Sequence, residues 1–258
     1  IFWPMLRRAL DAAGLLGLGQ APSPFILAST HRIMVVWFLG HVGIAGILST
    51  TVLAFGSAPQ AQALNIALQS LLGGGLAIWL IQRWGRRDQD MVGIWMPLRL
   101  ALSPSTGGAL GLFAWVVGGL GMGLVLLLFG AMVSTAIFGE HGSTQDAIEL
   151  FSEHRHFEIR AALAVSACVF APIFEEIIFR GFLYRNLRDM VGKTPAMCLT
   201  GLLFGLVHFD LPLVLPLAGL GFVLCLLFER SGTLLAPILV HAAWNTGQFG
   251  ILMLVVGG

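Results

Sequence analysis

The stretch FAPIFEEIIFRG, residues 170–181, places three charged side chains inside an otherwise apolar run. The charges are Glu175, Glu176 and Arg180, and apolar sequence precedes them through Ala161–Ala171. A charged side chain at the centre of a lipid bilayer costs roughly 2.5–3.5 kcal/mol on insertion scales. Such residues normally pair with one another or face a wet cavity, and they mark functional sites. The stretch therefore predicts a membrane helix that carries a polar site.

The composition of the whole chain supports a membrane location. Of the 258 residues, 57% are hydrophobic and 10% are charged, and the mean hydropathy is +0.89. A soluble domain usually carries about 25% charged residues, so we expect an integral membrane protein. The formal net charge of +1 and the lack of a long basic tract argue against a nucleic-acid partner. We predict an all-α fold, a polytopic transmembrane helical bundle.

Seven stretches are long and apolar enough to be candidate spans, because a spanning helix needs about 20 mainly apolar residues. An eighth candidate, 9–30, is interrupted by Pro22 and Pro24, and 88–104 is expected to form an amphipathic connector. The sequence thus predicts about 7–8 spans. The seven stretches are 33–55, 61–82, 107–137, 157–188, 194–209, 211–228 and 233–256.

The distribution of charge between the spans predicts their orientation. Basic residues are concentrated in 83–87 and 185–193, whereas the connection 139–157 is mainly acidic. Lys and Arg are enriched on the cytoplasmic side of membrane proteins. We therefore expect both basic clusters and the N-terminus to be cytoplasmic, in a plasma membrane of the bacterial inner-membrane kind.

Further polar residues occur in later apolar segments, at His208 and at His241 with Asn245. Residues four apart on a helix share a face, so His241 and Asn245 should project together. Glu176 and Arg180 have the same spacing and can form an ion pair. Glu175 is rotated by about 100° from Glu176, and the two carboxylates should therefore have different roles.

A helical hairpin would bring Glu175 level with His208. In an antiparallel pair, facing positions keep a constant index sum, which puts the turn between residues 191 and 192. Gly192 suits a helix end at that turn. The pair Gly201 and Gly205 would let the next helix approach a neighbour closely. Tilt of the helix after Arg230 would bring His241 and Asn245 to the same depth in the membrane as Glu175 and His208.

This set of side chains suits hydrolysis by an activated water. A carboxylate and a neutral imidazole, here Glu175 and His208, can share a water and take its proton as it attacks a carbonyl. The resulting oxyanion needs hydrogen-bond donors, which the side chains of His241 and Asn245 can supply. No serine or cysteine with a nucleophile motif accompanies them.

The same residues resemble the signature blocks of the CPBP intramembrane protease family, which includes the type II CAAX prenyl endopeptidases. The blocks stand here as Glu175-Glu176-x-x-x-Arg180, Phe204-x-x-x-His208 and His241-x-x-x-Asn245, in the order typical of that family. The resemblance covers about residues 155–250. It implies that Glu175 and His208 activate the water and that His241 and Asn245 form the oxyanion hole. Glu176, Arg180 and Phe204 would then provide structural or electrostatic support.

The resemblance also implies how the chain is organised and which substrates and partners it binds. Residues 1–150 would contribute N-terminal transmembrane helices and amphipathic connectors, and 151–258 the catalytic helical core of one integrated bundle. The implied partners are membrane lipid and a peptide or membrane-protein substrate, lipidated substrates included. Bacterial members of the family have also been linked to bacteriocin self-immunity. Association with other membrane proteins is a further expectation.

Three alternatives remain open at this point. Glu175, His208 and His241 could form a three-ligand zinc site, although the family mechanism implies no cofactor. A catalytically silent family member could serve as a subunit or scaffold of a membrane complex. Buried Glu and His side chains also occur as proton relays in transporters, but the chain shows no inverted repeat.

Other polar and small residues in the N-terminal half have simpler interpretations. We expect His41 to be a hydrogen-bonded core residue, and Asn65 with Gln69 to bind a neighbouring helix. The glycine runs 73–75 and 118–123 are expected to permit close packing between helices.

Overall fold

The computed structural model describes residues 24–55, 58–85, 107–139, 146–154 and 156–257. The described residues form helices joined by short turns and contain no strand, which confirms the predicted all-α bundle. Residues 9–23 of the weak first candidate and the expected connector 88–104 lie outside the described residues. The long helices are α2 (Pro24–Phe55), α3 (Pro59–Leu80), α4 (Gly108–Phe138), α9 (Lys193–Leu206), α10 (Leu211–Ser231) and α11 (Leu235–Gly257). The shorter ones are α5 (Asp146–Glu153), α6 (Phe157–Val165), α7 (Ala171–Glu176) and α8 (Arg185–Val191).

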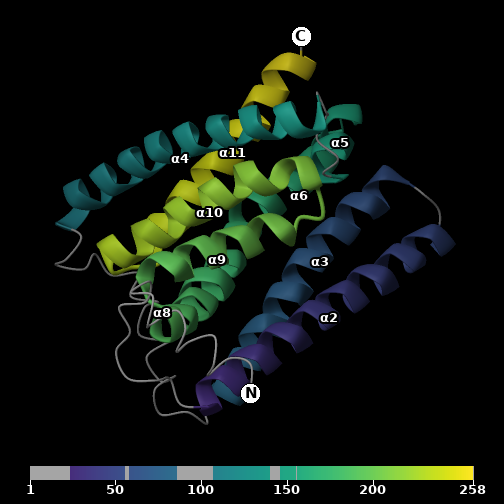
Figure 1. Ribbon diagram of the computed structural model, residues 1–258. Coiled ribbons are helices and arrows are strands. Elements are labelled where there is room, and N and C mark those ends of the chain that lie inside the picture. The colour runs from purple at the N-terminus through teal and green to yellow at the C-terminus, as the bar shows by residue number, and fades with distance from the viewer. Residues whose placement is uncertain (1–23, 56–57, 86–106, 140–145, 155, 258) are drawn as a thin grey trace.

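The helices that carry the polar residues lie between two outer layers. On one edge, α2 and α3 run side by side, and on the opposite edge α4 lies along α10 (Figure 1). Helix α11 contacts α4, α7 and α10, and α9 packs along α10. The N-terminal helices therefore belong to the same bundle as the C-terminal ones.

Five of the described helical segments are long and apolar enough to cross a membrane. They correspond to five of the predicted spans. The predicted spans 194–209 and 233–256 appear as α9 and α11 but are not among the five. Helix α9 has 14 residues and is about 21 Å long at 1.5 Å per residue, shorter than a bilayer core of about 30 Å. The five spans are Ala28–Val52, Pro59–Trp84, Gly108–Phe138, Phe157–Val191 and Leu211–Ser231.

The segment Phe157–Val191 is one continuous helical run with two π-helical stretches. The first is Ser166–Phe170 and the second is Ile177–Tyr184. Pro172, which follows the first stretch, cannot donate a backbone hydrogen bond and disfavours a regular helix around it. Wide π turns inside helices occur frequently at functional sites. Here they flank α7, the six residues that end in Glu175 and Glu176.

The predicted hairpin turn is present at Gly192, where α8 ends at Val191 and α9 begins at Lys193. Gly192 has φ +86°, which disfavours side chains with a Cβ atom. Residues Val207 and His208 form a turn, so His208 lies just beyond the end of α9 rather than within a helix as predicted. Phe209, three residues beyond the end of α9, adopts φ +54°, a left-handed conformation that a regular helix does not contain.

Glycines let α9 and α10 approach at backbone distance, as predicted. A Cβ atom on Gly201 would lie 2.6 Å from the Ala218 carbonyl oxygen. A Cβ atom on Gly205 would collide with the carbonyl of Val214. Because neither neighbour is a flexible side chain, only glycine fits these positions, and the close contact fixes where α9 ends relative to α10.

The glycine runs of the N-terminal half act only in part as predicted. Gly73 and Gly119 pack closely, because an added Cβ would meet the His41 ring and the Leu227 side chain respectively. Gly75 and Gly118 have nothing within 4 Å of such an atom.

One end of the bundle is closed by a cluster of ion pairs on Glu229 near the end of α10. Lys193 Nζ lies 2.6 Å from Glu229 Oε1, and Arg188 Nη1 lies 3.1 Å from Oε2. The Tyr184 hydroxyl donates to the same carboxylate at 3.1 Å. These contacts tie the α8–α9 turn to α10 at the predicted basic end.

Candidate active site

Adjacent carboxylates on α7 have different surroundings. The side chain of Glu176 is fully buried, whereas that of Glu175 is 29% exposed. Both follow from helix geometry, since neighbouring residues point about 100° apart. Glu176 faces the interior of the bundle and Glu175 faces open space.

Glu176 is held in place by two cationic or polar partners. Its Oε1 accepts a hydrogen bond of 2.6 Å from Arg180 Nη1 and lies 2.9 Å from Nδ1 of His241. Arg180 is also fully buried, and its Nη2 donates to the Gly221 carbonyl at 3.0 Å. The guanidinium lies 4.7 Å from the ring centre of Phe204, a distance favourable for a cation–π interaction. The predicted Glu176–Arg180 ion pair is confirmed.

His241 lies between the two carboxylates. Its Nδ1 faces Glu176, while its Nε2 lies 3.9 Å from Oε2 of Glu175. The second distance is too long for a direct hydrogen bond. Because an ionised carboxylate can only accept, Nδ1 of His241 donates to an ionised Glu176, and Nε2 points toward the more open side of the site.

His208 is oriented by the end of α9. Its Nδ1 lies 2.7 Å from the backbone carbonyl of Phe204. A carbonyl oxygen can only accept, so Nδ1 donates and Nε2 of the neutral ring is free to accept a proton. The Phe204 ring packs edge-on against both histidines, with centroid distances of 5.1 Å to His208 and 5.6 Å to His241. Phe204 thus spaces the two imidazoles.

Asn245 is fixed by the π-helical stretch that precedes α7. Its Nδ2 donates to the carbonyl of Ala167 at 2.7 Å. An amide nitrogen has two hydrogens, so one N–H remains for another acceptor. The side chain lines the same cavity as Glu175, His208 and His241.

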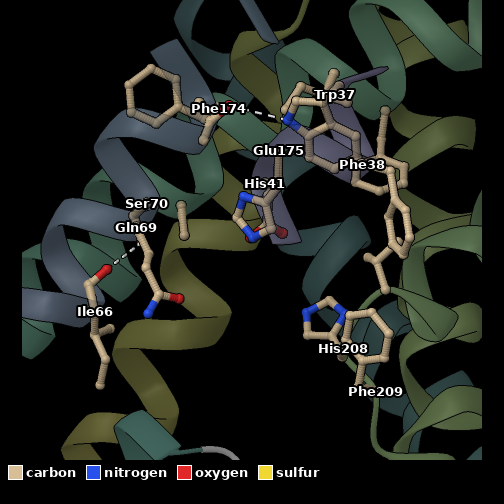
Figure 2. Close-up of a pocket in the computed structure, with 16 residues that line it drawn as sticks. Trp37, Phe38, His41, Ile66, Gln69, Ser70, Phe174, Glu175, His208 and Phe209 are labelled. Atoms are coloured by element: carbon tan, nitrogen blue, oxygen red, sulfur yellow. Dashed lines mark hydrogen bonds between the residues drawn. The ribbon is translucent and has the colours of Figure 1, made fainter. Parts of the chain in front are cut away.

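Two cavities meet at Glu175 and His208, and both residues line both of them. Cavity 1, of about 210 Å³, opens between α2, α3 and the turn after α9, as Figure 2 shows. Cavity 2, of about 360 Å³, also reaches His241 and Asn245 on α11. The buried Oε2 atom of Glu175 has no hydrogen-bond partner among the described residues. The structure therefore brings all four predicted site residues to the wall of cavity 2.

Some residues of this space were interpreted differently from the sequence. His41 was expected to be hydrogen-bonded in the core, but its buried Nδ1 has no hydrogen-bond partner among the described residues and the ring lines cavity 1. Gln69 binds Asn65 on its own helix, at 2.9 Å, instead of a neighbouring helix, and lines cavity 1 as well. Trp244, in cavity 2, was not singled out for the site at all. Periodicity alone gives no signal for His41 and Gln69, because α2 and α3 are far from α7 in sequence.

The zinc alternative, with Glu175, His208 and His241 as ligands, stays a prediction. Within the described ranges, no group of three His, Cys, Asp or Glu side chains is arranged to hold a metal ion.

Comparisons with known proteins agree with the location of this site. Residues 157–247 match the family model "Type II CAAX prenyl endopeptidase Rce1-like". This region is similar to that family. The match spans α6 to the middle of α11 and includes every predicted site residue, and it confirms the resemblance drawn from the sequence blocks.

One relative is the "Putative membrane peptidase YdiL" of Bacillus subtilis (strain 168). The chain is 27% identical to it over 135 residues, which is 51% of this chain and 53% of the relative. The chain thus spans about half the length of the curated relative that it matches. No solved structure matches the chain. The five long apolar helices support an integral membrane protein.

Proposed function

We propose that the protein is an intramembrane endopeptidase that hydrolyses a peptide bond with water activated by Glu175 and His208. The observation that carries this proposal is the position of both side chains where the two cavities meet. Glu175 has a buried carboxylate oxygen without a hydrogen-bond partner among the described residues, and His208 Nε2 is free to accept. Either group can hold a water and take its proton.

The reaction then proceeds through a tetrahedral intermediate. The water oxygen bonds to the carbonyl carbon while its proton moves to Glu175, assisted by His208. The intermediate collapses as the C–N bond breaks, and the proton held by Glu175 passes to the leaving amine. The immediate products are a carboxylic acid and an amine. The acid then gives its proton to the amine, and no atom changes its oxidation state.

The oxyanion would be stabilised from the α11 side. One N–H of Asn245 is available, because the other binds Ala167. His241 can donate from Nε2 only when both ring nitrogens carry hydrogen, since Nδ1 already faces Glu176.

The substrates that we infer are peptides or membrane proteins, lipidated ones included, and membrane lipid surrounds the helices. Bilayer-embedded cavities with mainly apolar walls suit segments that are themselves apolar. CAAX-type specificity is part of this proposal and is supported by the match to the Rce1-like model. The relative's name supports the peptidase class.

A comparison of Glu175→Gln with wild-type protein tests the mechanism. Membranes that carry each form are compared by proteomics for peptides that only wild type generates. We expect Glu175→Gln and His208→Ala to abolish cleavage, because each removes a group that activates the water. Glu158→Gln is a matched control, since Glu158 is exposed at the start of α6. Unchanged cleavage by Glu175→Gln would refute the mechanism, and a catalytically silent scaffold would show no wild-type-specific peptides.

We further propose that no metal is needed, and zinc on Glu175, His208 and His241 is the alternative. Purified protein is expected to contain less than stoichiometric zinc and to keep its cleavage activity in a chelator. Elemental analysis and a chelator titration measure both quantities. The zinc alternative would be favoured if wild type holds stoichiometric zinc and the His208→Ala variant loses both the zinc and the cleavage activity.

A further inference from the structure

The site has space on both sides of the reactive pair. Cavities 1 and 2 share five lining residues, which include Glu175 and His208. A peptide bond positioned at this pair would therefore have a cavity available for the groups on either side of it. The shared lining residues are Ile66, Ser70, Ala171, Glu175 and His208.

The walls that the cavities do not share have different chemistry. Cavity 1 is lined by aromatic rings from α2, from the α7 run and from the turn after α9. These rings are Trp37, Phe38, Phe174, Phe179 and Phe209. Cavity 2 has a largely aliphatic wall on α4 and α10, and its aromatic side chains are Phe204 on α9 and Trp244 and Phe249 on α11. The aliphatic side chains are Leu127, Ala131, Leu213, Pro216, Leu217 and Leu220.

The mouth of cavity 1 is formed by two aromatic side chains that remain accessible. Phe209 is 72% exposed, Phe38 is 36% exposed, and their ring centres are 6.0 Å apart. Phe209 also adopts φ +54°, a conformation that is unusual for a bulky residue and is typically retained where it serves a function. This backbone directs the Phe209 ring toward Phe38 beside His208, as Figure 2 shows.

The inner part of cavity 1 is preformed by contacts between α2 and α3. The Trp37 indole donates to the Gly73 carbonyl at 3.1 Å, and its ring lies edge-on to Phe179 at 6.2 Å. The missing Cβ of Gly73 leaves room for the ring of His41. Rigid aromatic walls bind apolar groups with little loss of side-chain entropy. Cavity 1 can thus accept a group without rearrangement of the helices.

We propose that cavity 1 is the subsite for an aromatic or large aliphatic side chain next to the scissile bond of the peptide substrate. The proposal rests on the endopeptidase function proposed above. Helices α2 and α3 supply much of this subsite and lie outside the matched region 157–247. Selectivity on this side of the bond is therefore set in part by helices that carry none of the sequence blocks.

Cleavage-site profiling of detergent-solubilised protein tests the subsite. The probe is a pool of peptides from a digested membrane fraction, and mass spectrometry identifies the residues on both sides of each cut. Wild type is expected to favour large apolar residues over alanine at one flanking position, on the order of tenfold. Phe38→Ala should weaken that preference at this position and leave the profile on the other side of the bond unchanged. Phe113→Ala is the matched control, because Phe113 is 66% exposed on α4 and lines neither cavity.

The outcomes separate the subsite from the catalytic function. Cuts that persist in Glu175→Gln would refute the proposed function. Cuts that depend on Glu175, with a profile that Phe38→Ala does not alter or alters equally on both sides, would refute the subsite alone. As a second measurement, a peptide with p-benzoylphenylalanine at the preferred position should photocrosslink to α2 or the Phe209 segment in Glu175→Gln. Crosslinks confined to α4 or α10 would contradict the assignment.

Discussion

At the residue scale, burial distinguishes two chemically identical neighbours. Glu176 is enclosed by Arg180 and His241, and its charge is matched where water cannot reach it. Glu175 keeps a partly exposed side chain that lines both cavities. Each carboxylate has a buried Oε2 atom without a hydrogen-bond partner among the described residues. Only Glu175 lines the cavities, where it can meet a substrate.

The ion pair of Glu176 and Arg180 yields a stability prediction. Arg180→Met should destabilise the protein by about 3–5 kcal/mol, because it leaves a buried carboxylate without its main counter-charge. The double variant Glu176→Gln with Arg180→Met should cost less, since no unpaired charge remains. Thermal unfolding in detergent measures both. A single variant no less stable than the double variant would contradict this account, and Glu175→Gln should unfold close to wild type.

At the element scale, irregular points in helices decide where the side chains lie. The π-helical stretches Ser166–Phe170 and Ile177–Tyr184 flank the six residues of α7, and Asn245 binds the carbonyl of Ala167 in the first of them. Helix α9 ends two residues before His208, which lets the imidazole bond back to Phe204. Regular helices would have placed these groups differently.

The close approach of α9 and α10 gives a prediction for this scale. Gly201→Ala should destabilise the bundle by about 1–3 kcal/mol, because the new Cβ would meet the backbone of α10 and overpacking strains a core. Gly75→Ala is the matched control in another apolar helix, where nothing lies within 4 Å of the added atom. We expect it to be neutral or to stabilise α3 by up to about 1 kcal/mol. Equal thermal shifts for the two variants would argue against the contact.

At the scale of the whole molecule, the bundle has chemically different ends. Arg32 near the start of α2 lies over the ring of Trp84, with 5.8 Å to the ring centre. Lys193 and Arg188 hold Glu229 at the α8–α9 turn. The acidic residues of α5 lie in the connection between α4 and α6. This distribution supports the proposal that the basic end faces the cytoplasm.

Cysteine labelling in sealed vesicles tests the orientation. In a variant whose native cysteines are replaced by alanine, Asp189→Cys should react with a membrane-impermeant maleimide only from the cytoplasmic side. Glu158→Cys should react only from the opposite side, since the run Phe157–Val191 is long enough to cross the bilayer between them. The reverse labelling pattern would show that the topology is inverted. Labelling of both cysteines from the same side would show that Phe157–Val191 does not cross the membrane.

The sequence by itself determined the fold class and the candidate reacting groups. Apolar composition requires helices in a membrane, because backbone polar groups in lipid must bond within their own segment. Charges such as Glu175 and Arg180 inside an apolar run indicate a site, because their burial must be compensated. The turn at Gly192 and the Glu176–Arg180 pair could also be predicted, since both depend on local helix geometry.

Only the tertiary structure decided which other residues share the site. His41 and Gln69 lie on α2 and α3, and no periodicity in their own helices relates them to Glu175. The contact of His241 with Glu176 joins residues 65 positions apart. Such neighbours arise from how helices pack against one another, and this depends on side-chain shapes along whole interfaces rather than on local spacing. The candidate catalytic residues can therefore be recognised from short sequence blocks, whereas the shape of the cavities depends on how the helices pack together.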